Sequence, residues 1–149
     1  MSILQGATTS FKVELFQAVH NFGPTSPNTF KVALYTADAN INASTTAYTS
    51  TNEVTGTGYT AGGNTLTIST SPTSGNDSSG TPTAYISFTN TSWTSASFTA
   101  RAALIYNDSA AGNPSVAVLD FGSDKTVSND TFQIIFPTPD ANSAIVRIS

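Results

Sequence analysis

The side chains most suited to acid–base or nucleophilic chemistry are scarce in this 149-residue chain. His20 is its one histidine, and the surrounding pattern predicts the last turn of a helix, with no serine or cysteine nucleophile nearby. We therefore predict a surface or capping role for His20. Glycosidase chemistry needs two carboxyl groups facing one bond, and Glu14 and Glu53 are the only glutamates. Because cysteine is absent, disulfides and thiolate metal sites are excluded.

Most aspartates stand in segments rich in turn-forming residues, where the side chain caps a turn. Asp120 differs because it interrupts the apolar stretch 116–121, and we expect it to pair with Arg101 or Arg147 across a sheet. A catalytic or Ca²⁺-binding role for Asp120 is the alternative. No run of aspartates at alternating loop positions supports a calcium site.

Two further patterns suggest ligands. The glycines at positions 56, 58, 62 and 63 suggest a phosphate loop, but no Lys-Ser/Thr pair follows and no helix is expected there. Tyr48, Tyr59 and Trp93 could stack on sugar rings, although aromatic side chains beside strands more often lie in a core or an interface. The sequence therefore predicts no catalytic, cofactor-binding or metal-binding residues, no cofactor and no enzymatic activity.

The composition disfavours two classes of partner. Hydrophobic residues make up 38% of the chain and aromatic residues 10%, enough for a core, whereas charged residues are only 9%. The net charge is −4 and the five basic residues are scattered, so a nucleic-acid partner is not expected. No segment approaches the roughly 18 apolar residues of a membrane span. The N-terminal residues also lack an export signal, so we expect a soluble protein made in the cytosol.

Helical spacing is confined to the start of the chain. An apolar stripe predicts one α-helix over residues 10–22, capped by Ser10 and stopped at Gly23, with the stripe formed by Phe11, Leu15, Ala18, Val19 and Phe22. We expect this helix to pack on the domain's own sheet; docking onto a partner is the alternative. Residues 1–9 are predicted to form a flexible, unanchored N-terminal arm, and residues 10–149 a single domain.

Beyond the helix, apolar and polar residues alternate with a period of two, which predicts β-strands. The central element is a hairpin over residues 98–121, whose strands offer the longest apolar surface and flank the turn-rich segment 107–114. Further strands are expected around 30–36, 66–68, 84–88, 132–136 and 144–148, with a segment from Trp93 leading into the hairpin. Residues 37–62 are predicted to form a long excursion, 71–82 a flexible tip and 123–125 a turn. About eight strands with one helix predict an all-β domain, an antiparallel β-sandwich or jelly roll.

The chain after Ser10 resembles small virion structural proteins of tailed bacteriophages along nearly its whole length. The similarity lies in segments without catalytic content: FKVALYT (30–36), TAYT (46–49), NEVTGTGYTAGG (52–63), AALIYN (102–107), VAVLDFG (116–122) and FQIIFP (132–137). Small jelly-roll proteins of this kind are commonly capsid decoration, or cement, proteins. The resemblance therefore implies a protein of the capsid exterior, made in the bacterial host cytoplasm. The implied partners are the phage major capsid protein and further copies of the chain, as a homodimer or homotrimer.

A cement protein needs rigid strands and a low-charge surface that desolvates cheaply, and this composition suits both needs. The N-terminal arm and the 37–62 excursion are the expected capsid contacts. A phage tail or fibre module that binds host surface carbohydrate through Tyr48, Tyr59 or Trp93 is the alternative function. A third class, a depolymerase, is disfavoured by the scarcity of His, Glu and clustered Asp.

Overall fold

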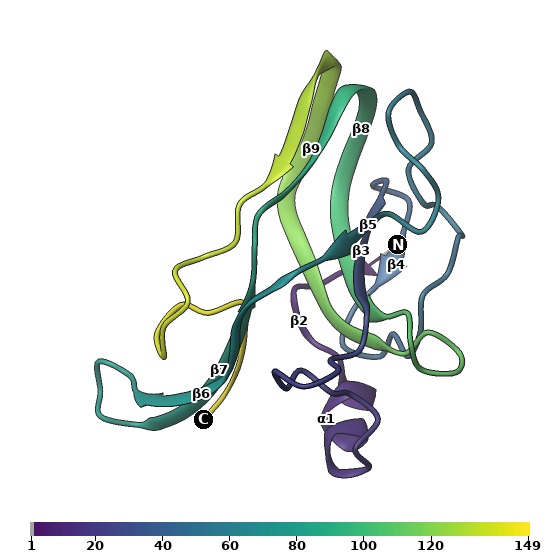
Figure 1. The fold of residues 1–149 in the computed structure, drawn as a ribbon. Coiled ribbons are helices and arrows are strands. Elements are labelled where there is room, and N and C mark those ends of the chain that lie inside the picture. The colour runs from purple at the N-terminus through teal and green to yellow at the C-terminus, as the bar shows by residue number, and fades with distance from the viewer. Residues whose placement is uncertain (1) are drawn as a thin grey trace.

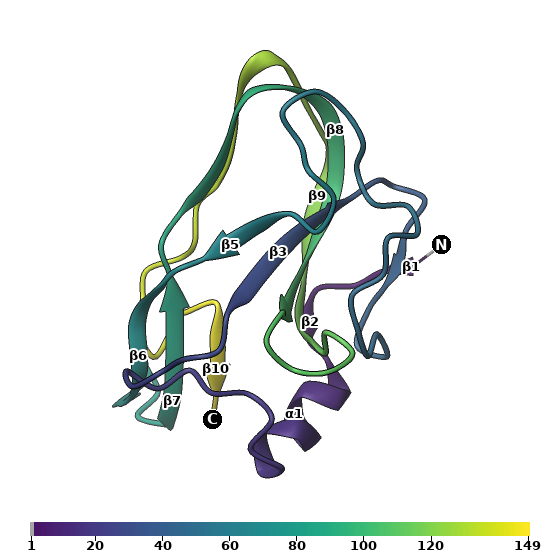
Figure 2. The same cartoon turned by 45° about the vertical axis from the view of Figure 1, so that its right-hand side comes forward.

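The computed structural model describes residues 2–149, and its elements are mostly strands with one helix (Figures 1 and 2). In chain order the elements are β1 (Ser2–Ile3), β2 (Gly6–Ala7), α1 (Thr9–Phe16), β3 (Phe30–Tyr35), β4 (Asn40–Ile41), β5 (Asn64–Leu66), β6 (Ile68–Asn76), β7 (Pro82–Phe88), β8 (Thr91–Asn107), β9 (Ser115–Ile134) and β10 (Val146–Ile148). The predicted all-β class with one N-terminal helix is confirmed.

The strands form a five-stranded sheet in the order β2-β9-β8-β3-β5, a three-stranded sheet β10-β7-β6, and a short pair β1-β4. Every pairing is antiparallel except that of β1 with β4. In Figure 2 the three-stranded sheet lies at the lower left, and α1 closes the bottom of the molecule. The edge strands of the two larger sheets, β2 and β5 in one and β10 and β6 in the other, therefore have a neighbour on one side only.

The five-stranded sheet is covered on both faces. Alternate residues of β3 point to opposite sides: Val32 and Leu34 join the larger core, and Ala33 and Tyr35 join a smaller one. The larger core includes side chains of α1 and of the three-stranded sheet, and the smaller core includes side chains of β4 and of the 37–62 excursion. Burial on both faces explains why the segments 102–107 and 116–119 are apolar at nearly every position.

The predicted central hairpin is confirmed and is longer than expected, because β8 begins at Thr91 and β9 continues to Ile134. The predicted turn at 123–125 is wrong: these residues lie inside β9, at a bulge. Ala100 pairs with Lys125 while Ala102 pairs with Asp120, so β9 carries extra residues opposite Arg101. On β8 the side chain of Ala100 belongs to the larger core and that of Ala102 to the smaller core. The turn formers Gly122 and Ser123 thus bend a continuous strand.

The helix is shorter than the predicted range 10–22 and ends at Phe16. Ala18, with φ +57°, takes the left-handed position, and the N–H groups of Ala18 and Val19 donate to the carbonyls of Leu15 and Glu14. This is the Schellman arrangement with alanine where glycine is usual, so the sequence carries no glycine signal for the stop. At the other end, Thr8 rather than Ser10 is the N-cap, and its hydroxyl accepts from the Phe11 N–H at 3.4 Å.

Two segments predicted as loose are paired in the structure. Within the predicted arm 1–9, residues 2–3 pair with β4 and residues 6–7 pair with β9, and Thr8 is buried; Met1 lies outside the described residues. Within the predicted tip 71–82, β6 extends to Asn76 and β7 begins at Pro82. Only residues 77–81 form the turn, which the Asp77 carboxylate caps by accepting from the N–H groups of Ser79 and Thr81.

Candidate functional site

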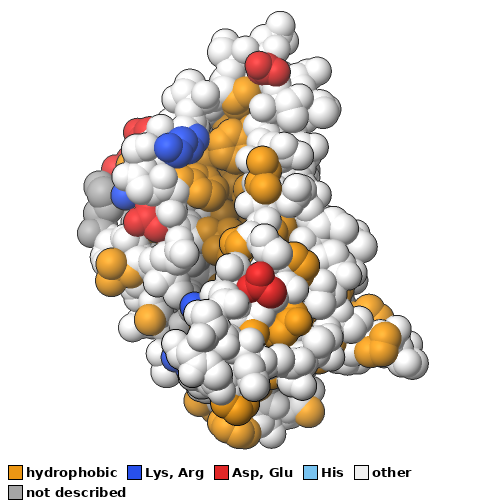
Figure 3. Space-filling view, turned by 90° about the vertical axis from the view of Figure 1, so that its left-hand side faces the viewer, with side chains coloured by type: hydrophobic (Ala, Val, Ile, Leu, Met, Phe, Trp, Pro, Cys, Tyr) orange, Lys and Arg blue, Asp and Glu red, His pale blue; other side chains and the backbone are white. Residues whose placement is uncertain are grey.

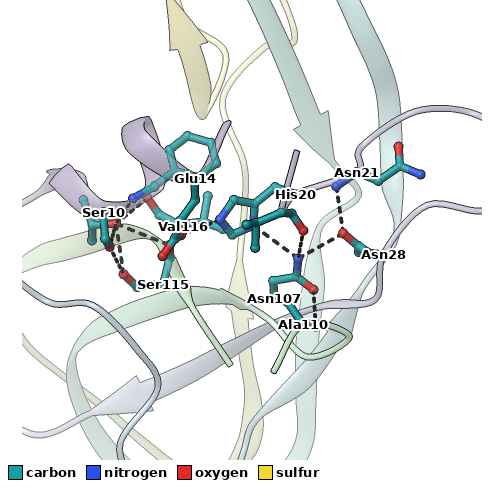
Figure 4. Close-up of polar contacts among 12 residues, drawn as sticks. Ser10, Glu14, His20, Asn21, Asn28, Asn107, Ala110, Ser115 and Val116 are labelled. Atoms are coloured by element: carbon teal, nitrogen blue, oxygen red, sulfur yellow. Dashed lines mark hydrogen bonds and ion pairs between the residues drawn. The ribbon is translucent and has the colours of Figure 1, made fainter. Parts of the chain in front are cut away.

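His20 lies in a polar cluster that joins the segment after α1 to the end of β8 (Figure 4). Its side chain is fully buried, Nε2 lies 2.7 Å from Glu14 Oε2, and Nδ1 lies 3.2 Å from Asn107 Nδ2. Asn107 also bonds Asn28 Oδ1 at 3.0 Å, and the His20 ring stacks near Phe22 and Phe30. The predicted surface or capping role of His20 is therefore wrong.

The hydrogen bonds select one tautomer of His20. Asn107 Oδ1 accepts from the backbone N–H groups of Ser109 and Ala110, so the Asn107 NH₂ group must face the histidine. His20 Nδ1 therefore accepts, and Nε2–H donates to the Glu14 carboxylate. Because both ring nitrogens are engaged, His20 is not placed to activate a serine, and the cluster holds the fold together.

Glu53 is a buried carboxylate, with 8% of its surface exposed. Oε1 accepts from the Tyr59 hydroxyl at 2.6 Å and from the Gly62 N–H at 2.7 Å, and Oε2 accepts from the Tyr48 hydroxyl at 2.7 Å. The Tyr59 oxygen in turn accepts from the Leu34 N–H at 2.9 Å, which fixes the excursion to β3. No sequence pattern indicated this cluster around Glu53, because its partners are common Tyr and Gly residues of a predicted loop.

Burial dominates the protonation of the tyrosines around Glu53. Desolvation, followed by the hydrogen bond to Glu53, raises the pKa of Tyr48 to about 12. Desolvation also raises the pKa values of Tyr35, Tyr59 and Tyr106 well above the usual value near 10. These hydroxyls therefore remain neutral donors at physiological pH. As neutral donors they hold the 37–62 excursion in place. Ionisation of any of them would leave a buried anion near Glu53.

The remaining candidates from the sequence have ordinary structural partners. Asp120 pairs with Arg101, which is one of its two predicted partners. Asp120 Oδ1 lies 3.2 Å from Arg101 Nη2. Trp93 is 4% exposed, and Tyr59 packs against it with ring centroids 6.0 Å apart. Tyr48 stacks on Tyr106 at 4.7 Å. Trp93 and Tyr59 therefore pack in the larger core, and Tyr48, which is half-buried, packs against the smaller one.

Within residues 2–149, no three His, Asp or Glu side chains are grouped closely enough to hold a metal ion. The one helix among these residues, α1, has 8 residues and is too short to cross a membrane.

The surface feature that stands out is apolar. Five large hydrophobic side chains are exposed, and Phe16, at the end of α1, is the most exposed at 96%. The others are Leu4, Val13, Ile135 and Ile148. Figure 3 shows hydrophobic side chains gathered along a hollow on the face at the left of Figure 1. Val13 and Phe16 both lie off the predicted apolar stripe of α1, and this was the sign in the sequence that the helix exposes apolar side chains.

A depression with apolar walls lies between α1 and β10, and we call it the α1–β10 groove. One wall is helical, with Phe11, Leu15 and Phe16, and the other is the edge strand β10, with Ile148. Ala84 and Ile86 of β7 extend the apolar lining beneath β10. The groove thus lies at the open side of the domain, where the edge of the three-stranded sheet faces the helix.

The α1–β10 groove and the two polar clusters differ in character. The polar clusters are satisfied internally, and the groove is open and apolar. Comparison of the chain with protein-family models, with curated proteins and with solved structures gave no match.

Proposed function

We propose that this chain is a non-catalytic structural protein of a tailed-bacteriophage particle, a capsid decoration protein that binds the outer surface of the major capsid lattice. The observation that carries the proposal is the apolar α1–β10 groove, which is lined by the exposed side chains of Phe16 and Ile148. Exposed hydrophobic patches on soluble domains mark interaction sites. The similarity of the sequence segments to phage virion proteins supplies the kind of particle.

The internal polar clusters support a static role. His20 is bound to Asn107, 87 positions away, and Glu53 is bound by three donors of its own excursion, so both residues stiffen the domain. Neither residue lines the groove. A protein that bridges capsid subunits needs such stiffness, because it must resist the pressure of the packaged genome. In this proposal the two packed sheets form a sandwich of jelly-roll type, and copies of the chain assemble as a homodimer or homotrimer on the capsid exterior.

The test is to locate the protein on particles of a phage that encodes it. Heads and tails are separated and assayed by mass spectrometry, and intact particles are labelled with an antibody against the purified chain. We expect the protein on heads only, and we expect particles assembled without it to lose DNA at a lower temperature. Detection in tails alone, or in neither fraction, contradicts the proposal. Saturable binding to host glycans, with the protein in tails, supports the carbohydrate-binding alternative instead.

A further inference from the structure

We propose that residues 40–49 form a binding site for an uncharged sugar, and we call this site the 40–49 pocket. The ligand is a neutral oligosaccharide, held by hydrogen bonds to amide and hydroxyl side chains. The inference goes beyond the proposed function, because it concerns a property of the isolated chain and does not depend on where the protein lies on the virion.

The lining of the 40–49 pocket is polar and uncharged. Two asparagines, one serine, three threonines, Ala47 and the ring of Tyr48 line it, and its volume is about 400 Å³. This volume falls in the range of small-ligand sites, but the walls of such sites are usually mostly apolar. Walls built from amides and hydroxyls instead suit a ligand with many hydroxyl groups, because each of these can donate and accept. A sugar has this chemistry.

The side chains of the pocket keep hydrogen-bonding capacity for a ligand. Asn40 Oδ1 accepts from Asn42 Nδ2 at 3.2 Å, and Thr45 Oγ1 accepts from the Asn42 N–H at 2.9 Å. These bonds use acceptor atoms, so the NH₂ group of Asn40 and the hydroxyl proton of Thr45 stay available as donors. The hydroxyl of Thr46 forms no hydrogen bond in the described part of the chain, and both Asn40 and Thr46 are exposed.

The backbone behind these side chains is held in place by hydrogen bonds from distant segments. The Thr9 N–H donates to the Ala43 carbonyl at 2.8 Å. Ser115 donates twice, from its N–H to the Thr46 carbonyl at 3.0 Å and from its hydroxyl to the Thr45 carbonyl at 2.8 Å. A site whose groups are already positioned loses less conformational entropy when a ligand binds, so this loop is preorganised for binding.

Tyr48 supplies an aromatic wall of fixed orientation. Its ring stacks on Tyr106 with centroids 4.7 Å apart, and its hydroxyl donates to Glu53 Oε2 at 2.7 Å. The side chain is nevertheless half-buried rather than enclosed. The C–H face of a sugar ring is apolar and can pack on such an aromatic ring while the sugar hydroxyls reach the amides and threonines.

The electrostatics of the pocket favour a neutral sugar over an anionic one. No lysine, arginine or histidine lines it. Tyr48 is neutral at physiological pH, because desolvation raises its pKa to about 12. An anionic sugar would therefore meet no cation, and it would bring its charge close to the buried carboxylate of Glu53, which Tyr48 contacts.

An uncharged polar peptide is the competing ligand. Peptides are usually anchored by apolar side chains in a groove or by a free strand edge. The 40–49 pocket offers one half-buried aromatic ring, and its other recognition groups are side-chain amides and hydroxyls. This balance favours a sugar, and the experiment below includes the peptide.

The experiment titrates the isotope-labelled full chain with sugars and follows the amide chemical shifts. The probes are lactose, cellobiose and N,N′-diacetylchitobiose, each compared with its carboxylated derivative, together with an uncharged peptide of serine and asparagine. We expect saturable shifts within residues 40–49 for at least one neutral sugar, with a Kd on the order of 1 mM. Its carboxylated derivative should bind at least about fivefold more weakly.

Matched variants separate the pocket from the rest of the surface. Asn40→Ala/Thr46→Val removes one amide and one hydroxyl from the pocket and should raise the Kd at least about fivefold. Asn76→Ala/Thr57→Val removes the same groups at exposed positions outside the pocket, and the Kd should not change. Thr46→Lys adds a cation and should remove the preference for the neutral sugar. All these positions are exposed, and unchanged amide spectra elsewhere verify folding.

The absence of saturable shifts with all three neutral sugars overturns the inference, as do shifts confined to residues outside 40–49. Stronger binding of the carboxylated derivatives, or binding of the peptide alone, also overturns it. So does an equal loss of affinity in the pocket variant and the control variant. The location of the protein on the particle is measured separately, so sugar binding by the isolated chain does not decide between heads and tails.

Discussion

The buried carboxylate of Glu53 and the buried imidazole of His20 show how this chain uses its few acidic and basic groups. A buried carboxylate costs free energy unless donors replace the lost water, and Glu53 has three donors from Tyr48, Tyr59 and Gly62. His20 is satisfied by Glu14 and Asn107. Each residue therefore fixes a segment without regular structure to a strand, and each is sensitive to a change of hydrogen-bonding capacity.

Substitution of Glu53 is expected to destabilise the protein in a graded order. Glu53→Gln keeps one acceptor oxygen for Tyr59 and Gly62, so the free energy of unfolding should fall by about 1–2 kcal/mol. Glu53→Ala leaves two tyrosine hydroxyls and one N–H without an acceptor, and the loss should reach about 3–5 kcal/mol. Urea unfolding followed by Trp93 fluorescence measures both, with the exposed Asp124→Asn as control. A Glu53→Ala protein as stable as the control would contradict a stabilising role for the hydrogen bonds to Glu53.

Residue-level prediction from the sequence succeeded where partners lie on neighbouring strands and failed where they are remote. The ion pair of Asp120 with Arg101 could be anticipated from a hairpin that the alternation already predicted. The environment of His20 could not, because its partner Asn107 is 87 positions away and the connection depends on how the post-helix segment folds back. The candidate groove was missed for the same reason, since α1 and β10 come from opposite ends of the chain.

At the scale of elements, strand periodicity predicted the paired segments, and the breaks between them were less predictable. The stretch 98–121 was found because both its strands are apolar, whereas the bulge of β9 was taken for a turn because Gly122 and Ser123 suit either structure. The helix end at Ala18 carries no glycine, so local signals placed the stop at Gly23. The two strands of the N-terminal segment have two residues each, too few for a period to show in the sequence, and their order comes from pairing with β4 and β9.

Truncation of the N-terminus tests whether the N-terminal segment is held in place by this pairing. Deletion of residues 1–9 removes the Thr8 cap, worth about 0.5–2 kcal/mol, together with the β2–β9 pairing and the Thr8–Ser115 hydrogen bond at 2.9 Å. We expect this protein to melt at least about 5 °C below the full chain. Deletion of residues 1–5 keeps β2 and Thr8, so its melting temperature should lie closer to that of the full chain. Circular dichroism measures both, and equal melting temperatures for the two truncations would contradict an anchored segment.

At the scale of the whole molecule, the five-stranded sheet separates two hydrophobic cores and contributes side chains to both. β3 and β8 send side chains to both cores, so neither core can be lost without exposing these strands. The 37–62 excursion links the two sides as well, since Tyr48 packs on the smaller core and Tyr59 on the larger one. Glu53, which binds both tyrosines, lies where the two sides are coupled. We infer that the domain unfolds as one cooperative unit.

Alkaline unfolding tests this coupling through the tyrosines. The pKa of Tyr48 is raised to about 12 in the fold, against about 10 in an unfolded chain, and those of Tyr35, Tyr59 and Tyr106 are also raised. Between pH 10 and 12 the unfolded state therefore binds fewer protons than the folded state. Stability that is fully present below about pH 10 must then fall as the pH rises through this range. Because the cores share one sheet, tyrosinate absorbance and Trp93 fluorescence should change together, and Tyr48→Phe should make the decline shallower. Ionisation of the tyrosines well before Trp93 responds would instead mean that the excursion detaches from a sheet that stays folded.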